Sequence, residues 1–215
     1  MQSFSVTAGT GALLLAAIAT PAIADIISSW NSAVTPSAPQ LREVTIDPST
    51  TALLLLGLMK ENCGAQPRCV AVVPNIKRVH DMARAHNMVV WYALVAENGG
   101  KGTPEDVVDP AIKPRPGEWY RLGGAEKFAG STLQPILQQG GIKTVIVCGY
   151  SFEGPILGTS IEATQRGYKV ILPVDCSAGR SEYREQYVTY QLGAGGPDAV
   201  TSNVTLTRST MLKFK

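Results

Sequence analysis

The sequence predicts an α/β protein, a Rossmann-like three-layer α/β/α sandwich whose mainly parallel sheet has about six strands. Continuous apolar runs such as TALLLLGL at 51–58 are typical of strands buried on both faces of a parallel sheet. These runs alternate with segments of helical periodicity, as in repeated strand–helix–strand units. A chain of 215 residues, 45% of them hydrophobic, is also long enough for one sizeable core.

The individual elements follow from these patterns. The first helix is expected at 73–87, because Val73, Ile76 and Val79 recur at helical spacing and Asn87 stands where a C-cap would lie. The Gly- and Pro-rich stretch 97–117 is expected to be a loop over the sheet edge. The other helices are expected at 131–141, 154–167 and 180–192, and the strands at 51–58, 88–95, 118–122, 143–150, 168–174 and, at an edge, 203–208.

The N-terminus resembles an export signal. Residues 1–24 carry no charge, contain the apolar run GALLLAAIAT and end in AIA, which matches the small-residue rule for signal-peptide cleavage. We expect cleavage after Ala24, a secreted or periplasmic protein, and no membrane contact after cleavage. The alternative is a short N-terminal anchor. Residues 25–50 are expected to form an extended arm, and 51–215 the domain.

Charge points to no macromolecular partner. Nineteen basic and seventeen acidic residues give a formal net charge of +2, and no run of Lys or Arg exceeds two residues. Nucleic-acid and anionic-membrane partners are therefore not expected.

The four cysteines divide into two pairs of different character. In an exported chain, Cys63 and Cys69 are expected to form a disulfide around the turn-rich stretch GAQPR. Their spacing fits neither a redox CxxC motif nor a zinc site, so a thiol oxidoreductase is the least favoured function. Cys148 and Cys176, at the ends of buried strands, are expected to be inert thiols. The two histidines match no ligand pattern, so neither a metal nor another cofactor is expected.

The strand ends of this pattern resemble the isochorismatase-like hydrolases, the cysteine hydrolase superfamily that includes nicotinamidases and carbamoylases. The resemblance runs from about Thr51 to about Arg208 and is strongest in TALLLLGLMKENC and in GIKTVIVCGYSFEGPILGTSIEATQRGYKVILPVDCSA. It implies the isochorismatase-like fold and a site at the carboxyl ends of the strands, where open α/β sheets bind ligands.

The residues that carry the family's chemistry are not matched. The general-base aspartate falls on Gly57, the lysine on Leu122 and the nucleophilic cysteine on Pro155. Glycine cannot take a thiol proton, leucine cannot polarise a carbonyl, and proline offers neither a nucleophile nor an amide N–H. The resemblance therefore predicts that the cysteine mechanism is absent.

Other polar residues at the strand ends could form a different site. The candidates for catalysis are Glu61, Arg121 and Glu153, and those for substrate binding are Glu97, Asn98, Tyr150 and Ser151. Any two of the ionisable groups in a shared cleft could act as an acid/base pair. Asp175, where the family also carries an aspartate, is expected to hold loops together by hydrogen bonds.

Two functions remain open. One is an exported enzyme that hydrolyses a small amide, ester or vinyl-ether substrate through a non-standard site. The other is a catalytically inactive family member that binds a small molecule or serves as an oligomeric scaffold. Tyr183, Tyr187 and Tyr190 recur on one helical stripe, which is typical of a core or a subunit interface, and a homo-oligomer is expected.

Overall fold

The computed structural model describes residues 25–94, 102–122 and 127–215. The chain divides into two compact units, Met1–Pro36 and Ser37–Lys215. In the first unit the Asp25 carboxylate accepts a hydrogen bond from the Ile27 N–H at 2.8 Å, and a 3-10 turn follows at Trp30–Ser32. The sheet and the helices belong to the second unit.

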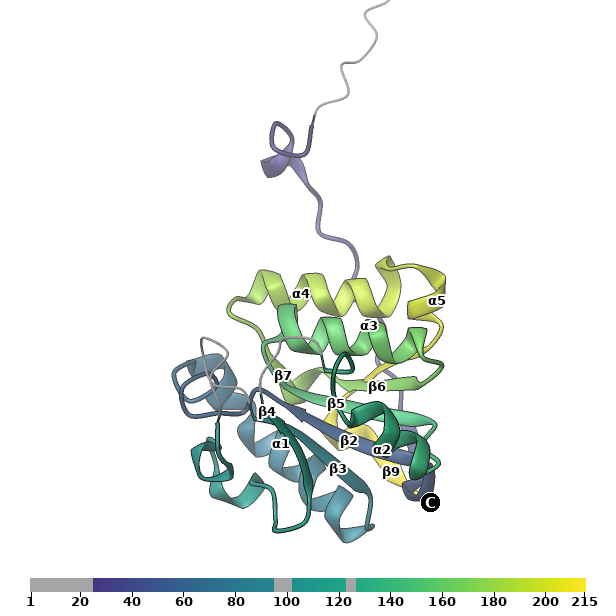
Figure 1. Ribbon diagram of the computed structural model, residues 1–215. Coiled ribbons are helices and arrows are strands. Elements are labelled where there is room, and N and C mark those ends of the chain that lie inside the picture. The colour runs from purple at the N-terminus through teal and green to yellow at the C-terminus, as the bar shows by residue number, and fades with distance from the viewer. Residues whose placement is uncertain (1–24, 95–101, 123–126) are drawn as a thin grey trace, which may run out of the picture. The chain divides into compact units, whose positions relative to one another are not determined.

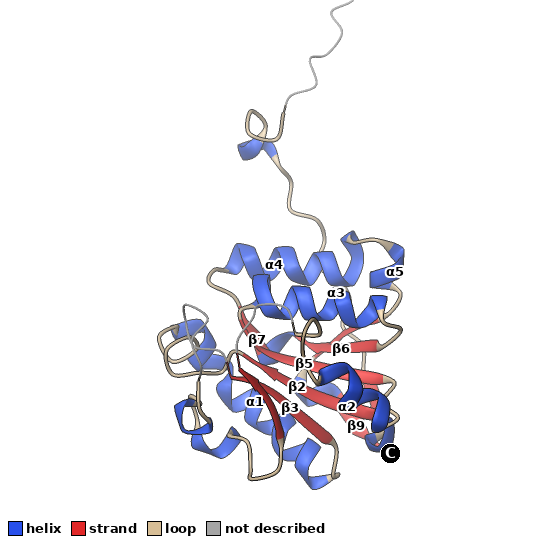
Figure 2. Ribbon diagram, viewed as in Figure 1, coloured by secondary structure: helices blue, strands red, loops and turns tan. Residues whose placement is uncertain are grey.

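A seven-stranded, entirely parallel sheet forms the centre of the second unit (Figures 1 and 2). Six strands lie in the order β4-β3-β2-β5-β6-β8, and β7 pairs with the end of β5. This confirms the predicted fold class and the expected edge strand. The strands are β2 (Thr51–Leu56), β3 (Val89–Leu94), β4 (Trp119–Leu122), β5 (Thr144–Tyr150), β6 (Lys169–Pro173), β7 (Ser177–Ala178) and β8 (Val204–Thr207).

The order of the strands creates a switch point between β2 and β5. From β2 the chain proceeds to β3 and β4 on one side, and then returns to β5 before continuing to β6 and β8 on the other. All six residues of β2 are buried, because both faces of this central strand are covered. In open α/β sheets the crevice at such a point is where ligands bind.

Helices cover both faces of the sheet. On one face lie α1 (Pro67–Ala85) and a separate two-stranded parallel sheet of β1 (Val44–Ile46) and β9 (Leu212–Phe214). The other face packs against α2 (Leu133–Gln139), α3 (Leu157–Gln165) and α4 (Glu182–Tyr190), and α5 (Asp198–Thr201) follows near the C-terminus. Figure 2 shows these layers as blue helices on either side of the red strands.

The predicted arm and first helix need correction. Residues 44–46 are a strand rather than part of an extended arm, and the second compact unit begins at Ser37. Helix α1 begins at Pro67, six residues before the predicted start, because proline suits the first helical turn and Cys69 extends the buried face of the helix. Asn87, just past its end, has a φ of 55°, as expected of a residue that ends a helix.

The predicted disulfide between Cys63 and Cys69 is present in the structure, with the two Cα atoms 5.1 Å apart. This separation lies inside the usual range for disulfides. Since Cys63 follows β2 and Cys69 lies in the first turn of α1, the bond ties the loop after β2 to the helix.

A buried polar network anchors α1 to the stretch after residue 102. The Arg84 guanidinium donates to Glu118 Oε2 at 2.7 Å and to the Tyr92 hydroxyl at 2.9 Å. His80 Nε2 lies 3.0 Å from the same hydroxyl. Burial raises the pKa of Tyr92 above its usual value, so this phenol stays protonated. The C-terminal end of the predicted loop is thus held against α1 by the hydrogen bonds of Arg84.

The tyrosine stripe of α4 is not part of the core. Tyr183 and Tyr187 are 65% and 49% exposed.

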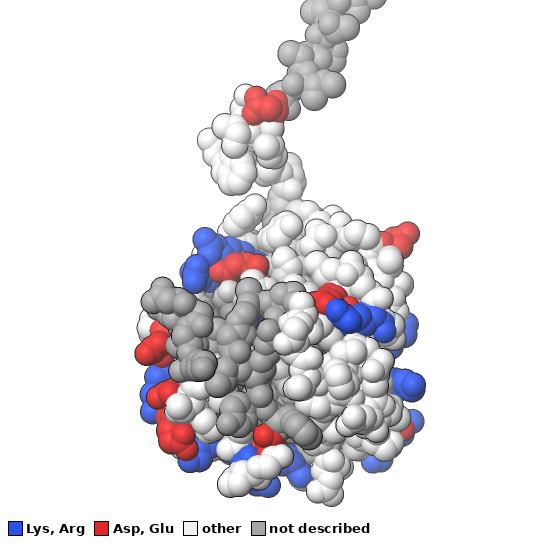
Figure 3. Space-filling model, in the orientation of Figure 1, with Lys and Arg blue, Asp and Glu red and all other residues white. Residues whose placement is uncertain are grey.

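On the face shown in Figure 3, acidic and basic side chains are interspersed and much of the described surface is uncharged. No helix among the described residues is long and apolar enough to cross a membrane.

Candidate functional site

The ends of β2 and β5 meet through their backbones at the switch point. Gly57 directly follows β2 with a φ of +65°, and a Cβ atom built on it would lie 2.1 Å from the carbonyl oxygen of Tyr150. No real Cβ atom approaches a backbone oxygen so closely, and a positive φ also favours glycine. This backbone therefore accepts only glycine at position 57, the position that the sequence resemblance predicts for the family's aspartate.

The turn after β5 leads directly into α3. Phe152–Ile156 forms a π-helical turn that contains Pro155 and buries Phe152 and Ile156. Ser151 before it is half-buried, and the buried Tyr150 hydroxyl has no hydrogen-bond partner among the described residues. Tyr150 and Ser151 thus lie at the carboxyl end of β5, and their role in substrate binding stays a prediction.

Glu153 is held against α4. Its Oε1 accepts a hydrogen bond from Arg184 at 2.7 Å, while its Oε2 is buried without a partner in the part of the chain that the structure describes. A Cβ atom built on Gly179 would lie 3.0 Å from this Oε2. Glu185 also contacts Gly179. Its carboxylate accepts a hydrogen bond from the Gly179 N–H at 2.8 Å and pairs with Arg68.

Two carboxylates, each with its own arginine, therefore flank Gly179. The arginines neutralise the charges, and the arrangement joins α1, α4 and the turn after β5. Glu153 and Glu185 therefore have a structural role and do not form an acid/base pair with each other. Only Glu153 Oε2 has no hydrogen-bond partner among the described residues.

The remaining predicted residues lie at several strand ends. Glu61 is exposed in the turn after β2 and shares no hydrogen-bond partner with Glu153 among the described residues. Arg121 and Leu122 end β4, in register with Ala93 and Leu94 of β3. Glu97 and Asn98 fall outside the described residues. The candidates among the described residues thus follow the carboxyl ends of several strands, and the convergence of the whole set on one pocket stays a prediction.

Lys127 was not predicted and is 1% exposed. It lies between β4 and α2, next to Phe128, and its carbonyl oxygen accepts from the Ser131 hydroxyl at 2.7 Å. Lysine is almost never fully buried unless its ammonium is paired. No periodicity marks this residue, and its position beside the Phe128 that matches the family is the only signal in the sequence.

Asp175 holds two loops together, as expected. Its carboxylate accepts from the Ser209 N–H and the Ser209 hydroxyl, both at 2.7 Å. Ser209 is buried and begins the 3-10 turn that precedes β9. The aspartate therefore fastens the C-terminal segment to the end of β6.

Asp175→Ala should lower the free energy of unfolding by about 1–3 kcal/mol, because two hydrogen bonds to a carboxylate are lost and the Ser209 N–H is left without its partner. Urea unfolding followed by circular dichroism measures this change. Asp175→Asn keeps one acceptor and should cost less. Equal stability of the alanine variant and the unaltered protein would contradict this role.

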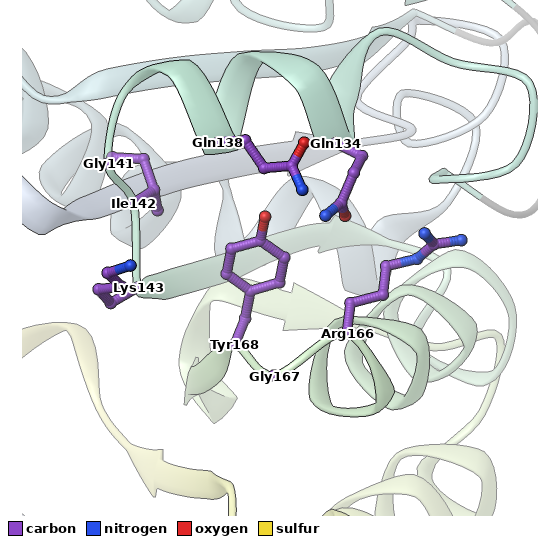
Figure 4. Close-up of a pocket in the computed structure, with 8 residues that line it drawn as sticks. All are labelled: Gln134, Gln138, Gly141, Ile142, Lys143, Arg166, Gly167 and Tyr168. Atoms are coloured by element: carbon purple, nitrogen blue, oxygen red, sulfur yellow. The ribbon is translucent and has the colours of Figure 1, made fainter.

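A shallow polar pocket of about 260 Å³ lies at the opposite edge of the sheet, where β5 and β6 begin (Figure 4). In Figure 4 the side chains of Gln134 and Gln138 extend from α2 toward the Tyr168 hydroxyl. Burial raises the pKa of Tyr168, and Gln134 Oε1 is buried without a partner among the described residues. The lining has no carboxylate; it comprises Gln134, Gln138, Gly141, Ile142, Lys143, Arg166, Gly167 and Tyr168.

Residues 25–94, 102–122 and 127–215 contain no group of three or more His, Cys, Asp or Glu side chains that could hold a metal ion.

The comparisons with known proteins agree with the resemblance. A family model described as the isochorismatase domain matches residues 51–203. An uncharacterised isochorismatase family protein, YwoC, from Bacillus subtilis is 30% identical over 165 residues, which covers 66% of this chain and 85% of that protein. Maleamate amidohydrolase from Pseudomonas putida is 26% identical over 168 residues, covering 78% of this chain and 76% of the enzyme.

Solved structures share the fold. N-carbamoylsarcosine amidase from Thermoplasma acidophilum superimposes with a TM-score of 0.62 at 22% identity, covering 74% of this chain and 96% of the amidase. A cysteine hydrolase from Pseudomonas syringae gives a TM-score of 0.65 at 18% identity, covering 82% of this chain and 95% of that one.

Proposed function

Because the chain belongs to the isochorismatase family, we propose that it is an inactive member that binds a small molecule at the carboxyl edge of its sheet. The proposed ligand carries an amide, ester or vinyl-ether group, and the cysteine mechanism of the family does not act on it. Of the two functions left open by the sequence, this one is favoured by the geometry at Gly57.

The observation that carries the proposal is the backbone contact between Gly57 and Tyr150. A Cβ atom 2.1 Å from the Tyr150 oxygen cannot be accommodated, which supports the proposal that position 57 holds no general base. Pro155 and Leu122 stand where the nucleophile and the lysine would be. Removal of a whole catalytic triad costs on the order of 10⁶ in turnover for a serine protease.

The ligand class is proposed from the relatives and from the groups at the edge. Two similar proteins are named after maleamate and N-carbamoylsarcosine. Maleamate is an amide and N-carbamoylsarcosine is a urea, and both are small molecules with a terminal CO–NH2 group and a carboxylate. Tyr150 and Ser151 offer hydroxyl groups that can bind a carbonyl or a carboxylate, and a helix start such as that after Ser151 favours anions. No cofactor enters this proposal.

The test uses maleamate and N-carbamoylsarcosine as probes. We expect no ammonia release above the buffer blank, while the P. putida maleamate amidohydrolase, as the positive control, hydrolyses maleamate in the same assay. A ligand that binds only the folded state raises the Tm, so a concentration-dependent rise is expected with at least one probe. Ser151→Ala and Tyr150→Phe should reduce that rise.

Treatment with iodoacetamide and the Cys148→Ser substitution should leave the Tm shift unchanged, because Cys148 is fully buried. If the unaltered protein hydrolysed a probe and Cys148→Ser abolished that hydrolysis in a folded protein, a displaced cysteine nucleophile would be the better explanation. If no Tm shift occurred with either probe, the proposed ligand class would be wrong.

A second candidate function is hydrolysis through a non-standard site. The observation in its favour is the buried Oε2 of Glu153, which has no partner among the described residues and could accept a proton from water. Glu153→Gln should then abolish ammonia release while the variant remains folded. The matched control Glu185→Gln removes the neighbouring carboxylate and should leave that activity in place.

We also propose that the protein is exported, with cleavage after Ala24. The uncharged N-terminal segment ending in AIA supports this, and so does the disulfide between Cys63 and Cys69, since such bonds persist in oxidising compartments. N-terminal sequencing of the secreted or periplasmic protein should begin at Asp25. A mature protein that retains Met1 would contradict the proposed cleavage.

A homo-oligomer is proposed from the exposed aromatic side chains of α4. Tyr183 and Tyr187 lie one helical turn apart and are largely accessible, as is common where subunits meet. Sedimentation velocity should give a mass above that of one chain, and Tyr183→Ser with Tyr187→Ser should lower it. A monomer at micromolar concentration would contradict the proposal.

A further inference from the structure

Cys148 of β5 and Cys176, which directly precedes β7, lie beside each other. The pairing of β5 with β7 aligns Gly149 with Ser177 and Tyr150 with Ala178. One residue earlier, the same register places Cys148 opposite Cys176, the last residue of the 3-10 turn Val174–Cys176. Paired strands lie about 4.7–4.9 Å apart, which is within the range of Cα separations found in disulfides.

Both side chains are on the same face of the sheet. Ile146, Cys148 and Tyr150 alternate along β5 toward the layer of α1, while Val145 and Val147 face the other layer. Cys176 and Ala178 belong to the same cluster as Cys148. The two thiols are each 0% exposed and unbonded to other cysteines, so they form a buried dithiol.

We propose that Cys148 and Cys176 are the site of a second disulfide, which forms when the chain folds in the presence of a small-molecule disulfide. With oxidised glutathione, one cysteine thiolate attacks a glutathione sulfur, forms a mixed disulfide and releases one glutathione thiolate. The other cysteine thiolate then attacks the protein sulfur of the mixed disulfide and releases the second. Two thiol protons pass to the two glutathione thiolates, so two cysteine thiols are oxidised and one glutathione disulfide is reduced.

The timing follows from burial. Burial, and in second place the neighbouring Cys148 thiol, raise the pKa of Cys176 well above its ordinary value, so little thiolate is available in the folded protein. The bond should therefore form during folding, before the strands close over the sulfurs, and only slowly once the protein is native.

Peptide mapping tests the proposal directly. The reduced, denatured chain is refolded with reduced and oxidised glutathione, blocked with iodoacetamide and digested with trypsin without reduction. Lys143, Arg166, Lys169 and Arg180 bound the relevant peptides, 144–166 with Cys148 and 170–180 with Cys176. We expect these two peptides to be linked. Recovery of both as separate, alkylated peptides, with only Cys63 and Cys69 joined, would overturn the proposal.

A variant without the first disulfide provides the matched control. In Cys63→Ser/Cys69→Ser, only the dithiol remains, and thiol titration after denaturation should find none following oxidative refolding and two following reduction. Adding Cys148→Ser leaves Cys176 without a partner, so the intact mass after oxidative refolding should show a free thiol or a mixed disulfide with glutathione, and one thiol should titrate after reduction. If the double variant fails to fold, the peptide map of the unaltered protein decides the question alone.

Discussion

Gly57→Asp, which introduces the residue that the resemblance predicts for the family at this position, should lower the free energy of unfolding by about 3–5 kcal/mol. The Cβ atom of any other residue would lie 2.1 Å from the Tyr150 oxygen, and the φ of +65° is itself unfavourable for a side chain. Because the clash joins a Cβ atom, fixed to the backbone directly after β2, to a backbone oxygen at the end of β5, the strain cannot be relieved by a rotamer change. Urea unfolding measures the loss, and activity is not expected to return.

Two alanine substitutions test whether the loss of stability comes from the Cβ atom at position 57. Gly57→Ala, which adds only the Cβ atom, should show most of the loss. Gly158→Ala in α3 meets nothing within 4 Å and should leave the protein unchanged or up to about 1 kcal/mol more stable, since alanine favours helices. A Gly57→Asp protein as stable as the unaltered one would mean that the strand ends can move apart, and the case for a closed position would be lost.

The second large effect is on acid stability and depends on His80. Burial, and in second place the nearby Arg84 charge, lower the pKa of His80 from 6.5 to about 4, while Asp81 and Glu118 act in the opposite direction. The unfolded chain therefore binds this proton at a higher pH than the folded one does. Stability is fully present above pH 6.5 and falls as the pH drops toward 4, by about 3 kcal/mol in total.

Unfolding free energies measured in urea between pH 4 and pH 7.5 test this dependence. His80→Gln cannot take up the proton and should flatten the slope of stability against pH, whatever its absolute stability. His86→Gln, at the exposed second histidine, serves as the matched control and should keep the slope of the unaltered protein. Identical slopes for His80→Gln and the unaltered protein would show that His80 is not the group responsible.

The central sheet could be predicted because its signals are local. The runs of β2 and β5 show no alternation of polar and apolar residues, which is typical of strands covered on both faces. The pairing of β1 with β9 could not be predicted in this way. Each has three residues, and their partner is chosen by contacts across the whole unit rather than by periodicity.

The candidate site was predictable in outline only. The predicted role of Asp175 as a loop anchor is confirmed, whereas the departures from the family at Gly57 and Pro155 stay a prediction from the resemblance. The sequence could not show that the backbone of Tyr150 fills the space beside Gly57, because that contact joins strands more than ninety residues apart. It also could not reveal the burial of Lys127, since composition and spacing carry no record of which lysine the fold encloses.

The small sheet of β1 and β9 has a consequence for how the protein folds and opens. Glu43 and Lys213, which pair beside it, are 170 residues apart, so the ribbon closes one of the longest loops in the chain. Closing so long a loop is entropically costly and is expected late in folding, after the parallel sheet has formed. The sheet of β1 and β9 is separate from the main sheet. Its amide protons can therefore exchange with solvent through local unfolding that leaves the ends of β2 and β5 intact.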